Sequence, residues 1–529
     1  MTEMNGAYPK KVVIAGGGTA GWMAATYLQR ALGDRVQITL VESDAISTIG
    51  VGEATFSTIR HFFRAIGLNE REWMPACNAT YKLGIRFVDW REPGHDFYHP
   101  FERPAVVQGF PLAEWWLRCR PTERFDRDCF VLAGVCDAML SPHTLDGVLF
   151  EDQDDASADA HRTTMADDDT QYPYAYHFDA ALLAGYLSKI GTGRGIRRLV
   201  DTIVDVRTGP EGIAGLVTAG HGLVEGDLYV DCTGFRGLLL GKALGVPFIS
   251  FQDTLPNDRA VALRVPADIE RDGIRPYTTA TAMDAGWMWT IPLFGRNGMG
   301  YVYSSQFSTE EEAERALREK AGPVAEGLAA NHIRMRIGRS RESWVGNCVA
   351  IGLASGFVEP LESTGIFFIH HGVEELVKHF PGETYDARLV ADYNQVVARC
   401  IDGIREFLSF HYFAAARTDN DYWRATKERP LPGDLAERTK LWQHKLPDAG
   451  SIYPYHHGFE AYSWTALLIG MGGLPVRQRP VVDALDPAPA LREFADIRRR
   501  GEKLAATLPS QYAYFENMRR TVQADLTLA

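Results

Sequence analysis

The chain has 529 residues, more than one hydrophobic core usually spans, so its length predicts two or more domains or subdomains. With 46% hydrophobic and 23% charged residues the composition is that of a folded globular protein, and a formal net charge of −13 argues against a general nucleic-acid binder. Seven scattered cysteines, with no Cys-x-x-Cys pair, argue against a zinc site or a disulfide framework and indicate free thiols in the cytoplasm. We expect no metal. The polar start, residues 1–11, predicts no signal peptide, and we expect no membrane span because no apolar run reaches about 18 residues.

The first motif is a glycine-rich turn between a predicted strand, residues 11–15, and a predicted helix, residues 22–32. Residues 36–41 predict a second strand, which ends at an acidic residue. Glycines at these spacings allow a tight turn and let the backbone approach a pyrophosphate at the helix N-terminus, while the acid can bind ribose hydroxyls. The pattern predicts a dinucleotide site, with a plain tight turn as the alternative. Its residues are Gly16, Gly18, Thr19, Ala20, Gly21 and Glu42.

The same turn occurs in FAD and NAD proteins, and two later features favour FAD. Asp231-Cys232-Thr233-Gly234 follows a predicted strand, a usual place for a second FAD contact, which adds Gly234 to the site. No second Gly-x-Gly-x-x-Gly follows a strand, so we expect no bound nicotinamide domain. Electrons would then arrive as free FADH2 from a separate flavin reductase.

The remaining patterns predict how the chain is organised. Residues 82–90 alternate and predict a half-buried strand, residues 228–231 and 344–351 predict two more strands, and residues 366–380 predict a helix. We therefore expect an α/β fold with a Rossmann-like, monooxygenase-type FAD-binding body of residues 1–100 and 175–380. An insertion, residues 101–174, and a mainly helical part, residues 381–529, would form the substrate-binding subdomain.

A rare string then narrows the class. Trp287-Met288-Trp289-Thr290-Ile291-Pro292 has the form Trp-x-Trp-x-Ile-Pro, the signature of flavin-dependent halogenases. Other strings resemble the same family, from the N-terminus to about Trp423: Gly16 to Met23, Gly50-Val51-Gly52-Glu53-Ala54-Thr55, Tyr81-Lys82, Asp231 to Gly237, and Phe357 to Gly365. Lys82 together with Leu361-Glu362-Ser363-Thr364-Gly365 resembles the tryptophan halogenases more than the phenol or pyrrole branches. The resemblance implies an enzyme that chlorinates or brominates the indole of tryptophan with FADH2, O2 and chloride or bromide.

The resemblance also implies catalytic roles for two residues. Hypohalous acid, formed from halide at the flavin, would move through an internal tunnel to the indole. Lys82 would hold it by a hydrogen bond or as a haloamine, and burial suits this role because it lowers a lysine pKa toward neutrality. Glu362 would stabilise the cationic intermediate and accept its proton, or polarise the halogen donor. Taken singly, Lys82 is typical of a solvent-facing strand lysine and Glu362 of an acid in a first helical turn.

Further roles follow from the same resemblance. Gly52, Glu53 and Ala54 would bind flavin, while Thr364 and Gly365 would bind halide through the backbone at a helix start. Trp287 and Trp289 would shield the flavin and block oxygenation of the substrate, and His99 and Phe101 would clasp the indole. The structural alternatives are a plain helix cap, two core tryptophans and an ordinary aromatic cluster. The residues with these implied roles are Gly52, Glu53 and Ala54 for flavin, Thr364 and Gly365 for halide, Trp287 and Trp289 for the shield, and His99 and Phe101 for the indole.

One segment departs from the family pattern. Free-tryptophan halogenases carry an adjacent tyrosine pair and a Glu-rich aromatic strap that hold the amino and carboxylate groups. In residues 451–460 we find no such pair, and Glu460 is the only acid. Because a desolvated ammonium needs a cage of carboxylates or carbonyls, this predicts a peptide-borne tryptophan, as in halogenases of lanthipeptides, within antibiotic or other natural-product biosynthesis. Free tryptophan is the alternative.

Two other classes remain. A one-component FAD aromatic monooxygenase would oxidise NAD(P)H itself, and a non-enzymatic flavin-binding protein would need neither Lys82 nor Glu362. The sequence leaves open the ring position, the halide preference, the reductase and the oligomeric state, a homodimer included.

Overall fold

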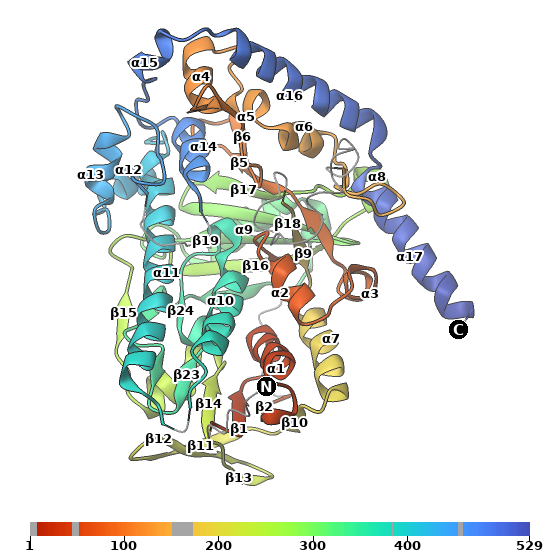
Figure 1. Cartoon of the computed structure of the whole chain (residues 1–529), viewed down its shortest axis with the longest axis vertical. Helices are drawn as coiled ribbons and strands as arrows, with labels where there is room; N and C mark the ends of the chain where they lie inside the picture. Colours follow the sequence, from red (N-terminus) through yellow and green to blue (C-terminus); the bar gives the residue numbers. More distant parts are fainter. Residues whose placement is uncertain (1–7, 45–51, 151–172, 383, 453–458, 529) are drawn as a thin grey trace, which may run out of the picture.

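The computed structural model describes residues 8–44, 52–150, 173–382, 384–452 and 459–528. Figure 1 shows an elongated molecule with the first strands at its lower end and the last helices across its top and right side. None of the described helices is long and apolar enough to cross a membrane. All seven cysteines are free, and all except Cys119 are buried.

A six-stranded sheet carries the dinucleotide motif. The central strand β1 pairs in parallel with β2 on one side and β14 on the other, with Val13 opposite Thr39 and Tyr229. Helix α1 covers the crossover from β1 to β2, so the predicted strand–turn–helix–strand unit and the α/β class are confirmed. In spatial order the strands are β10 (Arg197–Val200), β2 (Gln37–Glu42), β1 (Lys11–Ala15), β14 (Leu228–Asp231), β23 (Cys348–Ala350) and β22 (Trp344–Val345), with α1 at Thr19–Leu32.

The prediction of one strand over residues 344–351 is wrong. Strands β22 and β23 form a tight antiparallel hairpin, with Trp344 opposite Val349. Gly346 has a φ of 55° at the turn, a left-handed conformation that glycine adopts without strain. The apolar run is continuous because both arms of the hairpin are largely buried, so it could not show where the chain turns back.

A seven-stranded sheet, mostly antiparallel, lies above the first. It places the tryptophan string on β18, between β17 and β19. Its order is β20 (Asn331–Arg334), β16 (Arg259–Pro266), β19 (Arg296–Tyr303), β18 (Gly286–Leu293), β17 (Thr278–Met283), β5 (Gly84–Val88) and β6 (Asp96–Pro100).

Residues 82–90 do not form the single half-buried strand that their alternation predicts. The chain leaves one sheet at Lys82, where β4 ends, and enters another at Gly84, where β5 begins. Between them the Leu83 amide donates to the Pro276 carbonyl at 2.7 Å. Lys82 is therefore fully buried instead of facing solvent. The sheet that holds it has the order β3 (Glu53–Ala54), β9 (Ala175–Phe178) and β4 (Thr80–Lys82).

Smaller sheets complete the strand inventory. They are β11 (Ile203–Gly209), β12 (Gly212–Thr218) and β13 (Gly222–Val224); β15 (Phe248–Ser250), β21 (Gly338–Ser340) and β24 (Gly356–Phe357); and β7 (Val106–Val107) with β8 (Phe110–Pro111). The first of these lies at the lower edge of the molecule in Figure 1.

Helices dominate the upper part of the molecule. The predicted helix of residues 366–380 is α10, which begins two residues earlier, and the chain after residue 385 is mainly helical as expected. Within residues 101–150 the helices α4 to α6 pack beside α16, far from them in sequence (Figure 1). The helices are α2 (Ile59–Ala65), α3 (Glu70–Ala76), α4 (Leu112–Cys119), α5 (Phe125–Cys129), α6 (Val131–Asp137), α7 (Ala180–Gly193), α8 (Ile269–Asp272), α9 (Glu310–Ala321), α10 (Thr364–Lys378), α11 (Ala387–Ala414), α12 (Asp421–Glu428), α13 (Leu435–Leu441), α14 (Ala461–Met471), α15 (Pro480–Asp483), α16 (Ala488–Thr507) and α17 (Gln511–Leu528).

One large apolar core joins the sheet body and the C-terminal helices. The same buried cluster contains Ile14 of β1, Phe407 of α11 and Trp464 of α14. Because these side chains come from opposite ends of the sequence, the sheet body and the C-terminal helices bury their apolar faces against each other.

Candidate active site

A cavity of about 860 Å³ opens at the end of β1 and runs inward to Glu362 and Ser363. Its volume is within the range of pockets that bind cofactors. Most of the predicted flavin residues line it, as do both tryptophans of the signature string and Gly365. The predicted residues in its lining are Gly16, Gly18, Thr19, Ala20, Glu42, Gly52, Glu53, Ala54, Gly234, Trp287, Trp289, Glu362 and Gly365.

The glycine turn fits a dinucleotide. Gly16 has a φ of 106°, and a Cβ there would lie 2.4 Å from the Cys232 carbonyl oxygen. A Cβ on Gly21 would lie 1.8 Å from the Gly16 carbonyl oxygen, so Gly21 brings helix and strand together without lining the cavity. Side chains at these positions would force the turn open, and the bare backbone leaves the N-terminus of α1 facing the cavity, where it can bind a pyrophosphate.

Glu42 stands at the end of β2, as the sequence predicts for a ribose contact. Its carboxylate accepts from Trp22 Nε1 at 3.2 Å and pairs with the Arg198 guanidinium. Arg198 also lines the cavity, so these side chains form its adenosine end if the cofactor is FAD.

Asp231 has a structural role that the sequence did not reveal. Its carboxylate accepts from the backbone amides of Leu239 and Leu240 at 2.8 and 2.9 Å, and from the Thr233 hydroxyl at 2.6 Å. It therefore fixes the loop that carries Gly234 instead of facing the cofactor.

Glu53 adds a titratable group to the cavity. Burial and the nearby Asp179 carboxylate raise the pKa of Glu53 to about 7. Asp179 is held by Arg296 at 2.6 Å. A carboxyl of this pKa can donate or accept a hydrogen bond at neutral pH, which suits a polar edge of a flavin ring.

Lys82 does not line the cavity itself but is hydrogen-bonded to Ser363, which lines its inner end. Its Nζ donates to Ser363 Oγ at 2.8 Å and to the Thr55 carbonyl oxygen at 3.1 Å. Burial lowers the pKa of Lys82 to about 7, although the Glu362 carboxylate opposes this shift. The amine is thus poised between its charged and neutral forms near neutral pH.

Glu362 is clamped between two histidines. His99 Nδ1 lies 3.0 Å from its Oε1, and His411 Nε2 lies 2.9 Å from the same oxygen. Burial by itself would raise the pKa of Glu362, but His99 and His411 hold it well below its ordinary value. The backbone is left-handed at Glu362 and Ser363, with φ of 64° and 63°, which turns both side chains toward Lys82 and the histidines before α10 begins.

Sequence reasoning missed His411 and Ser363. His411 Nδ1 lies 2.8 Å from the Phe407 carbonyl oxygen, so both ring nitrogens face acceptors. Neither residue stands in a pattern that signals chemistry, except that Ser363 falls inside the string that contains Glu362.

Four separate parts of the chain supply the Lys–Glu cluster, which is defined as Lys82, His99, the neighbours Glu362 and Ser363, and His411. The predicted clasp residues border it. Phe101 lies with its ring centroid 5.0 Å from Lys82 Nζ, and the His99 ring lies 6.3 Å from Phe407 and 6.4 Å from Tyr462. Flat apolar faces therefore surround the amine and the carboxylate, which suits an aromatic substrate.

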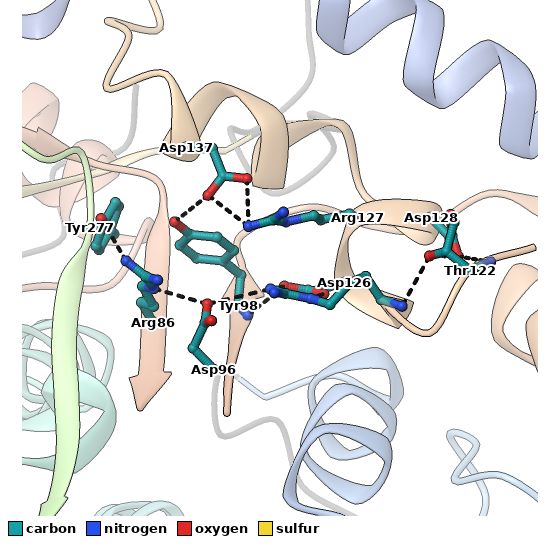
Figure 2. A network of polar contacts seen from close by, with 10 residues as sticks. Arg86, Asp96, Tyr98, Thr122, Asp126, Arg127, Asp128, Asp137 and Tyr277 are labelled. Carbon is teal, nitrogen blue, oxygen red and sulfur yellow. Dashed lines mark hydrogen bonds and ion pairs between the residues drawn. The ribbon is translucent and has the colours of Figure 1, made fainter. Parts of the chain in front are cut away.

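Strand β6, which carries His99, is held from its outer side by a polar network. Figure 2 shows Tyr98 between Asp126 and Asp137: its amide donates to Asp126 at 3.0 Å and its hydroxyl donates to Asp137 at 3.0 Å. Arg86 of β5 bonds Asp96 at the start of β6 at 3.0 Å. The helices α5 and α6 thus fix the strand that presents His99.

The structure describes the predicted halide site and the predicted lack of a substrate cage only in part. Gly365 lines the cavity, but Thr364 does not, and its buried hydroxyl makes no hydrogen bond within the described part of the chain. The predicted lack of a charged cage concerns residues 451–460, of which 453–458 lie outside the described residues, as do Gly50 and Val51. No group of three or more described His, Cys, Asp or Glu side chains could hold a metal ion.

A dinucleotide cavity that ends at a buried lysine, a clamped glutamate and aromatic faces defines a flavin-dependent enzyme of aromatic substrates. The family model described as tryptophan halogenase matches residues 11–487, and the chain belongs to this family of flavin-dependent tryptophan halogenases. As a member it uses FAD, halide and O2.

Three relatives are similar over nearly their whole length. The chain is 58% identical to tryptophan 6-halogenase SttH of Streptomyces toxytricini, over 98% of this chain and 100% of SttH. It is also 58% identical to 7-chloro-L-tryptophan 6-halogenase KtzR of Kutzneria sp. (strain 744), over 96% and 99%. The solved structure of Tar14, a tryptophan C-6 flavin-dependent chlorinase from taromycin biosynthesis, is 57% identical with a TM-score of 0.92, covering 96% of this chain and 100% of Tar14.

The peptide-specific branch is more distant. MibH, a lanthipeptide tryptophan 5-halogenase, is 30% identical with a TM-score of 0.82, covering 99% of this chain and 96% of MibH. The comparisons therefore favour free tryptophan, the alternative substrate, over the peptide-borne tryptophan that residues 451–460 suggested.

Proposed function

We propose that the protein halogenates free tryptophan at C6 of the indole, with chloride or bromide. The names of SttH, KtzR and Tar14 support the ring position. The observation that carries the free amino acid is an ion pair beside the predicted indole clasp, between Arg103 and Glu460. Free tryptophan thus replaces peptide-borne tryptophan as the substrate that we propose.

The two partners have the charges that a free amino acid needs. Arg103 Nη2 donates to Glu460 Oε1 at 2.6 Å, and the side chains are 37% and 46% exposed. Arg103 follows Phe101 by two residues, and Glu460 precedes Tyr462 by two, so the pair stands next to the aromatic faces. A guanidinium can bind an α-carboxylate in bidentate fashion and a carboxylate can bind an α-ammonium. A tryptophan within a peptide has neither charge.

The Lys–Glu cluster would direct the substitution. Reduced flavin, when bound, supplies with O2 the oxidation of halide to hypohalous acid. Lys82 in its charged form donates to that acid and keeps it beside the ring, and in its neutral form it can become a haloamine. Glu362 stabilises the cationic ring and accepts the proton that leaves the substituted carbon. His411 and His99 hold the carboxylate toward the substrate by their hydrogen bonds.

The remaining expectations complete the proposal. Gly16 to Gly21, Glu42, Gly52 to Ala54 and Gly234 hold FAD, Thr364 and Gly365 bind halide, and Trp287 and Trp289 shield the flavin. FADH2 comes by diffusion from a separate reductase in the cytoplasm. Residues 1–100 and 175–380 form the flavin body, and residues 101–174 and 381–529 bind substrate.

A substrate panel tests the proposal. The enzyme is supplied with a flavin reductase, FAD, NADH and chloride, and is given L-tryptophan, 7-chloro-L-tryptophan, N-acetyltryptophanamide or a tryptophan peptide. We expect L-tryptophan to give the highest kcat/KM and a product substituted at C6, identified by mass and NMR. KtzR's name makes 7-chloro-L-tryptophan the second candidate.

Two variants tie the outcome to the ion pair. Arg103→Gln and Glu460→Gln should each lower kcat/KM for L-tryptophan about 10-fold or more, as expected for a lost charged hydrogen bond, and change it little for N-acetyltryptophanamide. A peptide that outperforms L-tryptophan in the wild type, or equal losses for both substrates, would contradict the proposal.

A further inference from the structure

Glu359 belongs to the string Glu359-Pro360-Leu361-Glu362, yet none of the roles described above uses it. Its side chain is fully buried, and no cationic side chain of the described residues forms a hydrogen bond or ion pair with it. Instead it accepts hydrogen bonds from neutral donors on separate elements: Asn257 Nδ2 at 2.8 Å, Trp287 Nε1 at 3.1 Å, and the Tyr412 hydroxyl. All three donors meet at Oε2, and the backbone amide of Asn257 lies 3.4 Å from Oε1. Such a set of donors makes a buried carboxylate tolerable.

The contact with Trp287 reaches the cavity wall. Trp287 and Trp289 alternate on β18, both line the cavity, and their ring centroids lie 6.2 Å apart. They are held in different ways. The Trp289 ring packs directly on Gly300, where a Cβ would lie 2.0 Å from the ring. Its Nε1 has no hydrogen-bond partner within the described residues. Trp287 has a polar anchor, and Glu359 is that anchor.

The same network connects to the catalytic glutamate. Adjacent residues of α11 hold the two glutamates of the string: Tyr412 bonds Glu359, and His411 bonds Glu362. Asn257 is itself fixed by the Tyr422 hydroxyl at 3.0 Å. The wall at Trp287 and the carboxylate at Glu362 therefore share one support on α11.

We propose that Glu359 is a positioning residue that fixes the Trp287 indole in the cavity wall and thereby keeps the passage from the flavin residues to the Lys–Glu cluster at one width. A displaced indole would let water and oxidant leave this path. The consequence for turnover rests on the proposed halogenation, whereas the consequence for Trp287 does not.

The direct test is 19F NMR of the full-length enzyme labelled with 5-fluorotryptophan. The Trp287 signal is assigned by its loss in Trp287→Phe. In Glu359→Met, which removes the acceptor but keeps the length of the side chain, the signal should shift and broaden. Glu359→Gln, which keeps an acceptor oxygen, should give a signal closer to the wild type. Tyr412→Phe, which removes a second donor to the same carboxylate, should shift the Trp287 signal less than Glu359→Met does. The exposed Glu319→Met on α9 is the control: it removes a carboxylate elsewhere and should leave the Trp287 signal at its wild-type position.

The second measurement is the amount of halogenated product per FADH2 oxidised, with the remainder counted as hydrogen peroxide. We expect Glu359→Met to lower this ratio on the order of fivefold, as for one lost buried hydrogen bond, with Glu359→Gln in between. In a double-mutant cycle Glu359→Met should add little to the loss caused by Trp287→Phe. If Glu359→Met does not fold, Glu359→Gln takes its place in the cycle.

An unmoved Trp287 signal, or effects of the two substitutions that simply add, would overturn the proposal. So would a rate that falls while the ratio of product to peroxide stays constant. Should the wild type fail to halogenate tryptophan, the proposed function fails, but the NMR result still decides whether Glu359 holds Trp287.

Discussion

Lys82 is an amine buried completely among neutral hydrogen-bond partners, Thr55 and Ser363. Folding removes it from water without giving it a carboxylate in direct contact, so its charged form is penalised. Near neutral pH the folded enzyme contains both forms. Both forms are therefore available for the role proposed for Lys82.

This penalty has a thermodynamic consequence. The pKa of Lys82 is about 7 in the folded protein and near 10.5 in the unfolded chain, so the unfolded chain binds more protons between these values. Stability should therefore rise with pH above 7, by roughly 1.4 kcal/mol per pH unit for this group, and be flat below. We expect the Tm of the wild type, relative to that of Lys82→Met, to increase between pH 7 and pH 9 in calorimetry. A constant difference would show that Lys82 is charged throughout.

Lys82→Ala should abolish halogenation and leave FAD binding intact. Lys82 lies beyond the cavity lining, so its loss does not disturb the cofactor residues. Product formation by mass spectrometry and FAD affinity by fluorescence quenching measure the two effects. Ring halogenation by this variant at the normal rate would remove Lys82 from the mechanism.

Glu362→Gln should slow halogenation by about 10²-fold, as for a lost general base. The amide keeps the size of the side chain, and with its oxygen in the place of Oε1 it keeps both histidine contacts there, but its NH2 group cannot accept the His99 contact that Oε2 makes at 3.1 Å. Single-turnover rates at saturating tryptophan measure the effect, with circular dichroism as the control for folding. An unaltered rate would leave Glu362 with a structural role at the start of α10.

For single residues, the sequence predicted which side chains belong to the site better than it predicted whether they are buried and what they contact. The family strings predicted that Lys82 and Glu362 matter, and the structure brings them to one cluster through Ser363. The alternation around Lys82 suggested a solvent face, because a pattern of apolar and polar letters cannot show that a lysine is buried. His411 could not be found at all, since a single histidine on an apolar helix is usually a satisfied core residue.

Among the elements, β6 shows how the insertion serves the site. Asp126, from α5, accepts from the Tyr98 amide (Figure 2). It also forms an ion pair with Arg124 at 3.0 Å. Asp126→Ala would leave a buried amide and a guanidinium without this partner. We expect a loss of about 2–3 kcal/mol in stability, read as a lower Tm. Asp137→Ala, at a 36% exposed carboxylate, should cost less, and equal losses would contradict the importance of burial here.

Elements with strong local signals were predictable. The β1–α1–β2 unit follows from its glycines and β-branched residues, and α10 follows from its helical period. The errors at residues 82–90 and 344–351 have one physical cause: in both, the chain changes sheet or direction inside a run that is largely buried. Burial on both sides of the change leaves the residue pattern uninterrupted, while the turn depends on partners far away in sequence, such as Pro276 for Leu83.

At the scale of the whole molecule, the cavity of about 860 Å³ has the size for a cofactor, and the sequence has one Gly-x-Gly-x-x-Gly after a strand. We therefore expect the FAD-loaded enzyme not to be reduced by NADPH or NADH alone in an anaerobic stopped-flow trial. Addition of a flavin reductase should start turnover. Flavin bleaching by NADPH without a reductase would instead favour the one-component monooxygenase.

The parallel sheet also sets an order of events during synthesis on the ribosome. Strand β1 is made first, but its neighbour β14 and the next strand β23 end at residues 231 and 350. The cavity lining also includes residues up to Ile369, so the cavity can close only after that residue is made, and His411 follows 42 residues later (411 − 369). At about 5–20 residues per second this interval lasts roughly 2–8 s. A nascent chain could thus hold flavin for only seconds before the histidine that clamps Glu362 is available.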